Sequence, residues 1–314
     1  MSTYFTRWKK GLFSLILGTT LVFAGCSGST APEEGNGAWK VTATTGMVAD
    51  IVKQVGGEHV EVTQLMGAGV DPHLYKASEG DIKRIDQADI IFYSGLHLEG
   101  KMVEIFEKIG KTKPVKPVTA KLTKEDLLAD PASPDNPDPH VWFDVSLWMK
   151  AVEQVRDDLI AFDAAHQADY SANAEKYLAE LKELDAYAKA QLASIPKEQR
   201  VLVTAHDAFQ YFGRAYEVEV LGLQGISTAS EYGLKDVQKL VDTLVDRRIK
   251  AVFVESSVPK RSIEAVVQGA AAKNHSVSIG GELFSDAMGA PGTPEGNYLG
   301  MVKHNVDTIV GALK

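Results

Sequence analysis

Residues 169–196 read DYSANAEKYLAELKELDAYAKAQLASIP, the longest regular pattern in the chain. Its apolar positions recur at intervals of three or four residues, at Tyr170, Ala174, Tyr177, Leu181, Leu184, Ala188, Leu192 and Ile195. This spacing predicts one helix with a single buried stripe. A helix over Asp169–Ala193 would be about 37 Å long at 1.5 Å per residue, enough to run along two lobes as a stiff spine. Pro196 then ends it.

Short apolar and β-branched runs alternate with helical patterns on both sides of this helix. The predicted strands are Trp39–Thr44, Val60–Leu65, Asp89–Tyr93, Val115–Val118, Arg200–Thr204, Val218–Leu223, Ala251–Val254 and Val277–Ile279. The predicted helices are Met47–Val55, Ser78–Ala88, Lys101–Ile109, Phe209–Tyr216, Leu234–Arg247, Arg261–Lys273 and Asn297–Leu313. Such alternation predicts parallel sheets covered by helices. We therefore expect an α/β fold of two lobes, each a small parallel sheet flanked by helices, with an N-terminal lobe at 38–165, a linker helix at 166–195 and a C-terminal lobe at 196–314.

The beginning of the chain has the layout of a secretory signal. A basic segment, 1–10, precedes an apolar run over 11–23 that is too short to span a bilayer. Small residues then precede Cys26, the only cysteine, so no internal disulfide is possible. This arrangement resembles the lipobox of bacterial lipoproteins. We expect 1–25 to be a lipoprotein signal peptide, Cys26 to be lipidated and 26–37 to be a flexible tether; the alternative is an ordinary secretory signal with an unmodified cysteine.

The charge of the chain excludes one class of partner. The formal net charge is −9, and the sequence shows no basic cluster of the kind that phosphate contacts require. We therefore expect no nucleic-acid partner.

One tripeptide occurs twice, as Asp71-Pro72-His73 and as Asp138-Pro139-His140, in a chain with 12 prolines and 8 histidines. Proline fixes its own φ and pushes the preceding Asp toward extended geometry, so each His emerges from a rigid loop. Neutral imidazole is the commonest protein ligand for late first-row divalent metals. The two loops predict a metal site, whereas the alternative is a pair of Asp-Pro turns with exposed histidines.

Two loops of the second lobe complete a donor set. His206 follows directly on a predicted strand, and Asp286 comes shortly after another. Ligands of α/β proteins gather where loops leave the carboxyl ends of strands. Three imidazoles and one carboxylate, two groups from each lobe, suit a divalent transition metal. Glu255 also ends a strand, and we expect it to support a ligand or to be an alternative ligand; Asp71 and Asp138 either support their imidazoles or only form turns.

Several motifs together resemble, in order along the chain, the TroA-like metal-specific solute-binding lipoproteins of bacterial ABC importers. They are Asp71-Pro72-His73, Asp138-Pro139-His140, Thr204-Ala205-His206-Asp207-Ala208-Phe209, Val254-Glu255-Ser256-Ser257 and Gly280-Gly281-Glu282-Leu283-Phe284-Ser285-Asp286-Ala287-Met288-Gly289. The resemblance covers essentially the whole mature chain. It implies two lobes joined by one backbone helix, with a single Mn²⁺ or Zn²⁺ in the cleft, held by His73, His140, His206 and Asp286.

The same resemblance implies partners and a location. The protein would be a monomer, anchored outside the cytoplasmic membrane through Cys26, that delivers its metal to an ABC permease. The sequence has no Gly-x-x-x-x-Gly-Lys-Ser/Thr segment for nucleotide binding, so the energy must come from a separate ATPase.

The metal is the harder question. Three imidazoles and a carboxylate suit zinc, whereas manganese prefers more oxygen donors. The loop from Lys121 to Asp138 contains no His, whereas the zinc branch of the family often carries a His-rich loop there. The manganese branch, in turn, often has Glu where this chain has His206. We expect manganese as the transported ion, with zinc as the alternative and with zinc binding in vitro, as the Irving–Williams order favours.

Two other functions remain open at this point. A secreted zinc hydrolase could use the same donors, with Glu255 or Glu282 as general base, but the sequence lacks a His-Glu-x-x-His motif and splits its donors between two lobes. A surface adhesin with a structural metal is the other alternative. Capture and release explain the divided donor set better than fixed chemistry, so we expect no enzyme.

Overall fold

The computed structural model describes residues 37–131, 133 and 136–314, and residues 37–314 form one compact unit. The expected signal segment lies outside the described residues, as does the expected tether apart from Gly37. Cys26 falls in that part of the chain, so its expected lipidation concerns a residue outside the description.

The first lobe is built on a four-stranded parallel sheet with the strand order β2-β1-β3-β4. The strands are β1 (Trp39–Ala43), β2 (Val60–Gln64), β3 (Ile90–Tyr93) and β4 (Val115–Pro117). In the central strand, Val41 lies opposite Val62 on one side and Ile90 on the other. Apolar runs of this kind form parallel sheets because helices cover both faces.

The second lobe holds two parallel two-stranded ladders, β5-β6 and β7-β8. Their bounds are β5 (Val201–His206), β6 (Glu219–Gln224), β7 (Ala251–Glu255) and β8 (Ser278–Leu283). Strands β5 and β7 contact each other, and every residue of both is buried. The last residues of these two strands, His206 and Glu255, therefore arrive together in the interior.

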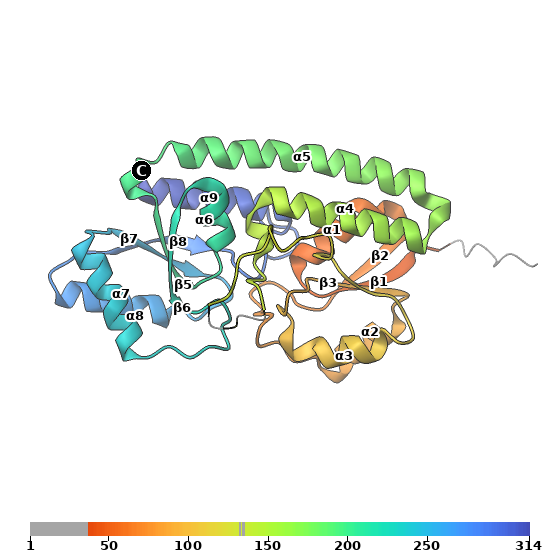
Figure 1. Ribbon diagram of the computed structural model, residues 1–314, viewed down its shortest axis with the longest axis horizontal. Helices are drawn as coiled ribbons and strands as arrows, with labels where there is room; N and C mark the ends of the chain where they lie inside the picture. Colours follow the sequence, from red (N-terminus) through yellow and green to blue (C-terminus); the bar gives the residue numbers. More distant parts are fainter. Residues whose placement is uncertain (1–36, 132, 134–135) are drawn as a thin grey trace, which may run out of the picture. The chain divides into compact units, whose positions relative to one another are not determined.

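Helices cover the sheets on two sides (Figure 1). They are α1 (Gly46–Gly56), α2 (Glu79–Gln87), α3 (Val103–Ile109), α4 (Val145–Phe162), α5 (Gln167–Ala193), α6 (Gln210–Tyr216), α7 (Leu234–Asp246), α8 (Arg261–Ala272) and α9 (Tyr298–Leu313). Short 3-10 helices occur at Gly57–His59, Gly100–Met102, Val141–Phe143, Ala164–His166 and Lys197–Gln199. Within the described residues, no helix combines the length and the apolar character needed to cross a membrane.

Helix α4 is the one long helix that the sequence analysis did not predict. The Asp144 carboxylate caps it by accepting hydrogen bonds from the main-chain N–H groups of Ser146 and Leu147, which a helix cannot satisfy internally. The cap lies four residues after His140, so the start of α4 fixes the end of one candidate ligand loop.

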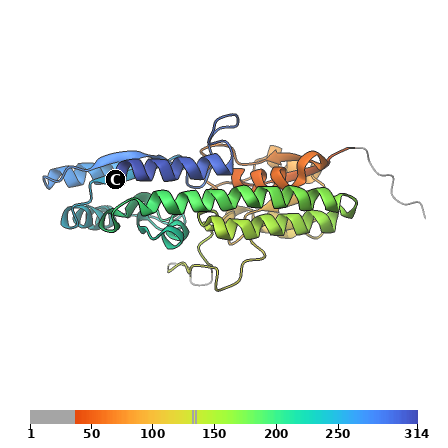
Figure 2. The same cartoon turned by 90° about the horizontal axis from the view of Figure 1, so that it is seen from above.

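Helix α5 is the predicted long helix. Its buried residues, Tyr170, Ala174, Tyr177, Leu181, Leu184, Ala188 and Leu192, are those of the predicted stripe. It runs beside α4 and α9, which belong to different lobes (Figure 2). The stripe belongs to one hydrophobic cluster with residues from Val41 to Leu313, so α5 connects the two lobes through a shared core.

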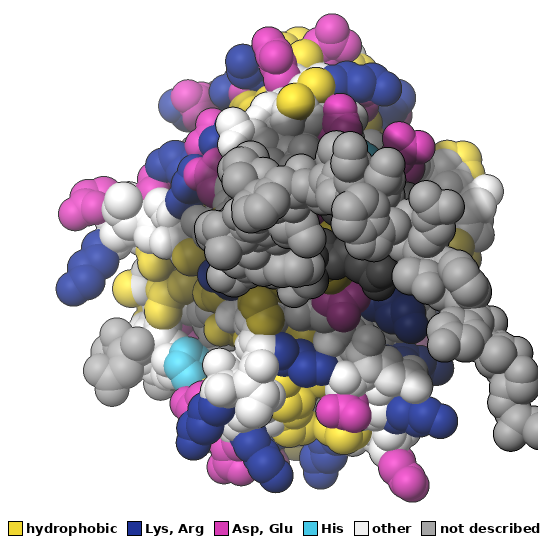
Figure 3. Space-filling model, turned by 90° about the vertical axis from the view of Figure 1, so that its right-hand side faces the viewer, with side chains coloured by type: hydrophobic (Ala, Val, Ile, Leu, Met, Phe, Trp, Pro, Cys, Tyr) yellow, Lys and Arg dark blue, Asp and Glu magenta, His cyan; other side chains and the backbone are white. Residues whose placement is uncertain are grey.

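The surface carries both signs of charge. On the face shown in Figure 3, Lys and Arg side chains are interspersed with Asp and Glu, and no continuous basic patch is visible among the described residues.

Candidate metal centre

The structure brings the four predicted donor residues together. His73, His140, His206 and Asp286 are all buried, and one ligand atom from each lies within 4.8 Å of the other three. His73 and His140 come from loops of the first lobe, after β2 and β4. His206 is the last residue of β5, and Asp286 lies in the loop after β8. Each group therefore follows a parallel strand, as the sequence predicts.

The distances fit a common central ion. The Nε2 atoms of His73 and His140 are 3.2 Å apart. Asp286 Oδ1 is 3.3 Å from His140 Nε2, and Asp286 Oδ2 is 3.3 Å from His206 Nε2 and 3.9 Å from His73 Nε2. Ligand atoms bound tetrahedrally at 2.1 Å from a metal would be ~3.4 Å apart. The four groups thus surround a space of the right size for one ion.

The first Asp-Pro-His loop is fixed at its backbone. Asp71 Oδ1 accepts a hydrogen bond from the main-chain N–H of His73 at 2.9 Å. Asp71 Oδ2 accepts a second one from the Thr228 hydroxyl at 2.6 Å. Asp71 is therefore more than a turn former, although it does not contact the imidazole.

The second Asp-Pro-His loop is held more completely. Asp138 Oδ1 accepts a hydrogen bond from the main-chain N–H of His140 at 2.9 Å and lies 2.7 Å from the ring Nδ1. Tyr211 donates its hydroxyl hydrogen to the Asp138 carbonyl oxygen at 2.9 Å. With Nδ1 paired to a carboxylate, Nε2 is the nitrogen left to face the centre.

The loop around His140 is part of the core. Val141, Trp142 and Phe143 are buried within the central hydrophobic cluster, and the Trp142 and His140 ring centroids are 5.1 Å apart. The Trp142 indole N–H donates to the Ser285 carbonyl oxygen at 3.1 Å, just before Asp286. The Tyr298 hydroxyl donates to the Trp142 carbonyl oxygen at 2.6 Å. The His140 and Asp286 loops are thus tied together in the interior.

Glu255 supports His206 and not the central space. Its Oε1 accepts a hydrogen bond from the His206 main-chain N–H, and its Oε2 lies next to Nδ1 of the same residue. Both side chains are fully buried. A carboxylate on the far nitrogen of a ligand imidazole fixes the tautomer and raises its basicity.

The four donor groups shift one another's pKa values because they are buried close together. Burial lowers the pKa of His73 to about 3. Burial also opposes a charge on His140, but the carboxylates of Asp138 and Asp286 outweigh it and raise the pKa to about 9. For His206, the carboxylates of Glu255 and Asp286 outweigh burial and place the pKa well above the ordinary value. Burial raises the pKa of Asp286, but His206, His140 and His73 together bring it well below the ordinary value.

Unpaired buried atoms support a ligand at this point. His206 Nε2 and both Asp286 carboxylate oxygens are buried and lack a hydrogen-bond partner. Buried polar atoms almost always have a partner, and a bound cation would supply one to all three. Three imidazole nitrogens with one or two carboxylate oxygens match the donors of late first-row divalent metals. Among residues 37–131, 133 and 136–314, these four form the only such group.

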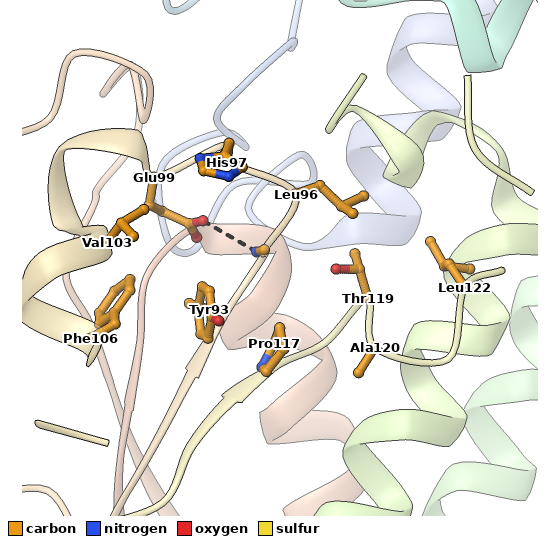
Figure 4. A pocket seen from close by; sticks show the side chains of 11 residues that line it. Tyr93, Leu96, His97, Glu99, Val103, Phe106, Pro117, Thr119, Ala120 and Leu122 are labelled. Carbon is orange, nitrogen blue, oxygen red and sulfur yellow. Dashed lines mark hydrogen bonds between the residues drawn. The ribbon is translucent and has the colours of Figure 1, made fainter. Parts of the chain in front are cut away.

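A pocket lined by one histidine, His97, lies apart from this group. Figure 4 shows His97 beside Glu99, with Tyr93 and Phe106 farther away, and the Glu99 carboxylate directed at the Gly95 main-chain N–H. Glu99 also accepts hydrogen bonds from Thr44 and Ser94, so its buried carboxylate is satisfied by the protein itself. Glu99 therefore holds the loop that follows β3 in place.

The remaining histidines have partners elsewhere. His59 pairs with Asp169, His275 lies 2.7 Å from the Ile249 carbonyl oxygen, and His304 lies 3.0 Å from the Glu282 carbonyl oxygen. His166 contacts Asp163. None of these is in the four-residue group found among the described residues.

Sequence analysis missed the residues that hold the loops from a distance. Thr228, Tyr211 and Ser285 contact partners far away in the chain, and no local pattern marks them. Their roles depend on which loops the fold brings together.

Comparisons with known proteins agree with this geometry. The family model "ZnuA: Zinc-uptake complex component A periplasmic" matches residues 41–312. The chain is 50% identical over 307 residues to the manganese-binding lipoprotein MntA of Bacillus subtilis, covering 98% of this chain and 100% of the relative. It is 47% identical over 279 residues to the zinc-binding protein TroA of Treponema pallidum, covering 87% and 88%. The solved structure of periplasmic TroA matches with a TM-score of 0.86 at 47% identity, covering 88% of this chain and 99% of that chain. These matches confirm the resemblance that the motifs predict, and with it the two-lobed α/β fold.

Proposed function

Because the chain belongs to the ZnuA family of metal-binding receptors of ABC transporters, which are not enzymes, we propose that it captures one divalent transition metal ion and hands it to a membrane permease. The observation that carries this proposal is the group of four buried donors, two from each lobe, within 4.8 Å of one another. Receptors of this kind work with a permease and a separate ATPase. The family assignment argues against the alternative of a secreted zinc hydrolase.

The ion is held by the Nε2 atoms of His73, His140 and His206 and by the carboxylate of Asp286. Asp138 and Glu255 each pair with the Nδ1 of a ligand imidazole and so direct its Nε2 toward the ion. Asp71 positions the backbone of His73. Because the ion is transported, these residues must bind it strongly enough to capture it and must also allow it to dissociate at the permease.

We favour manganese as that cargo. The two oxygens of Asp286 face different imidazoles, Oδ1 toward His140 and Oδ2 toward His206, each at 3.3 Å. This orientation suits a bidentate carboxylate and gives a set of three nitrogens and two oxygens, which suits manganese better than three nitrogens and one oxygen. The 50% identity to a protein named as manganese-binding supports the same choice.

Zinc is the second candidate. The relative named as zinc-binding is 47% identical over 279 residues, so its similarity is nearly as high. Imidazole donors favour Zn²⁺ over Mn²⁺ in intrinsic affinity. Zinc therefore binds in vitro, and availability in the host decides which ion is carried.

The proposal includes a location and an assembly state. Relatives such as the Bacillus subtilis protein are named lipoproteins. We propose that Cys26 is lipidated and anchors the chain outside the cytoplasmic membrane, and that residues 26–37 act as the tether. The receptor acts as a monomer, since both lobes of one chain supply the donor set.

The test is elemental analysis of the protein purified from its native host without chelators. One manganese per chain supports the proposal, and one zinc per chain supports the second candidate. Titration of the metal-free protein with each ion gives the stoichiometry. Absence of any bound ion in both experiments would contradict the assigned function.

A further inference from the structure

The two Asp-Pro-His loops use their aspartates in different ways. Asp138 is fully buried and directs one oxygen at both the backbone and the ring of its own histidine, His140. Asp71 is only partly buried and divides its oxygens between the backbone of His73 and the hydroxyl of Thr228. Thr228 lies between β6 and α7, in the second lobe. The bond from Thr228 to Asp71 therefore crosses from one lobe to the other.

Thr228 is itself held by the strands that carry another ligand. The Gln224 side-chain amide donates to the carbonyl oxygens of Thr228, at 2.7 Å, and Ser230. Gln224 is the last residue of β6 and lies opposite His206 in the β5-β6 ladder. A continuous set of contacts thus leads from the strand pair of His206, through Thr228 and Asp71, to the backbone of His73.

This connection differs in exposure from the bonds that hold the His140 loop against the second lobe. The bond from Trp142 to the Ser285 carbonyl oxygen, which ties the loops of His140 and Asp286, is buried. Asp71 and Thr228, in contrast, line a surface pocket together with Leu74, which is 50% exposed. The His73 loop therefore borders solvent, and an accessible hydrogen bond holds it across the lobes.

We propose that Thr228 is a positioning residue that keeps the metal centre closed, because its hydroxyl holds Asp71 and Asp71 holds His73. The inference rests on the proposed function of the centre. When this hydrogen bond breaks, the His73 loop is free to move while His140, His206 and Asp286 remain in place. Thr228 consequently sets the rate at which the ion leaves more than the rate at which it binds.

The test is the release of Mn²⁺ from the full chain into excess EDTA, followed by stopped-flow tryptophan fluorescence, since Trp142 lies beside His140. Thr228→Val keeps the shape of the side chain and removes the donor. We expect its dissociation rate to rise about tenfold, as for the loss of a hydrogen bond to a charged group, with the association rate within about twofold of the original. Thr228→Ser keeps the hydroxyl and should restore slow release.

A matched control separates this bond from general damage to the loop. Ser227→Ala removes a neighbouring hydroxyl that accepts from the Ala229 main-chain N–H. It should leave the dissociation rate unchanged. If Thr228→Ser releases Mn²⁺ as fast as Thr228→Val, or if Ser227→Ala does so, the hydroxyl of Thr228 has no special role and the inference is overturned.

A double-mutant cycle tests the route through Asp71. In an Asp71→Ala background, Thr228→Val should add no further increase in the dissociation rate. A full tenfold increase in that background would overturn the route. The two proposals fail differently: a wild-type chain that binds no ion overturns the proposed function and this inference with it, whereas one ion per chain with wild-type release from Thr228→Val overturns this inference alone.

Discussion

Glu255 holds His206 at two points, with one carboxylate oxygen 2.9 Å from the main-chain nitrogen and the other 2.5 Å from Nδ1. Both residues end adjacent strands, β7 and β5, so the pairing follows from the fold. The two contacts leave His206 little freedom to turn away from the centre.

Glu255→Gln should weaken metal binding by about 10–100-fold, because an amide replaces the charged partner of a ligand imidazole. The stoichiometry should stay at one ion. Isothermal titration gives both quantities. Glu282→Gln is the matched control, since its carboxylate pairs with the exposed Lys260. Equal affinities of the two variants would contradict the role of Glu255.

His140→Ala should reduce affinity by more than Glu255→Gln does, because it removes a donor and not only a support. The loop also belongs to the core, since Val141, Trp142 and Phe143 are buried in the central cluster. We therefore expect a lower melting temperature with a native circular dichroism spectrum. His97→Ala, outside the centre, should change neither property, and unchanged stoichiometry and affinity in His140→Ala would exclude His140 as a ligand.

Metal affinity should rise with pH between about 7 and 9. The pKa of His140 is raised to about 9, and that of His206 lies well above the ordinary value, so both imidazoles carry protons at neutral pH when no metal is bound. A metal ion must displace these protons, and raising the pH removes this competition. Titration in buffers of different ionisation enthalpy measures the protons released. Zero release at pH 7 would contradict the protonated state.

Tyr177→Phe should destabilise the protein without altering the metal centre. The Tyr177 hydroxyl on α5 donates to the buried carboxylate of Asp50 on α1 at 2.7 Å. Loss of the donor leaves a buried carboxylate oxygen with fewer partners, which costs about 1–3 kcal/mol of unfolding free energy. Urea denaturation measures the change. Tyr187→Phe is the control, because its hydroxyl contacts Asp307 on the surface, and a similar loss there would point to a general effect of the substitution.

Metal binding should change the dimensions of the chain very little. Helix α5 contacts helices of both lobes and shares their core, so wide hinge opening would expose a large buried surface. Small-angle scattering should give nearly equal radii of gyration with and without metal. A marked compaction on adding metal would show that the lobes do swing about α5.

Local patterns explain why much of the fold was predictable. The stripe of α5 and the short apolar strands are encoded within a few residues, and such periodicities persist in the folded chain. Helix α4 carries an equally local signal, since the Asp144 cap precedes a helical pattern with buried Trp148 and Val152.

For the metal centre, the donor residues were predictable from the sequence, but their supporting contacts were not. The repeated Asp-Pro-His tripeptide marks His73 and His140 locally, and the ends of strands mark His206 and Asp286. The contacts of Thr228 with Asp71 and of Trp142 with Ser285 join positions more than a hundred residues apart. Such pairs depend on the final packing of loops, which no window of sequence contains.

The apolar stripe of α5 lies in a cluster that draws on both ends of the chain, from Val41 to Leu313. A chain severed on either side of α5 would leave that stripe facing water in whichever half retained it, so the halves are not autonomous folding units. The cluster is complete only when α9 is present, because Met301, Val306 and Leu313 belong to it. We expect a chain that ends before α9 to be degraded by proteases because its core is incomplete, and not to fold and bind metal with lower affinity.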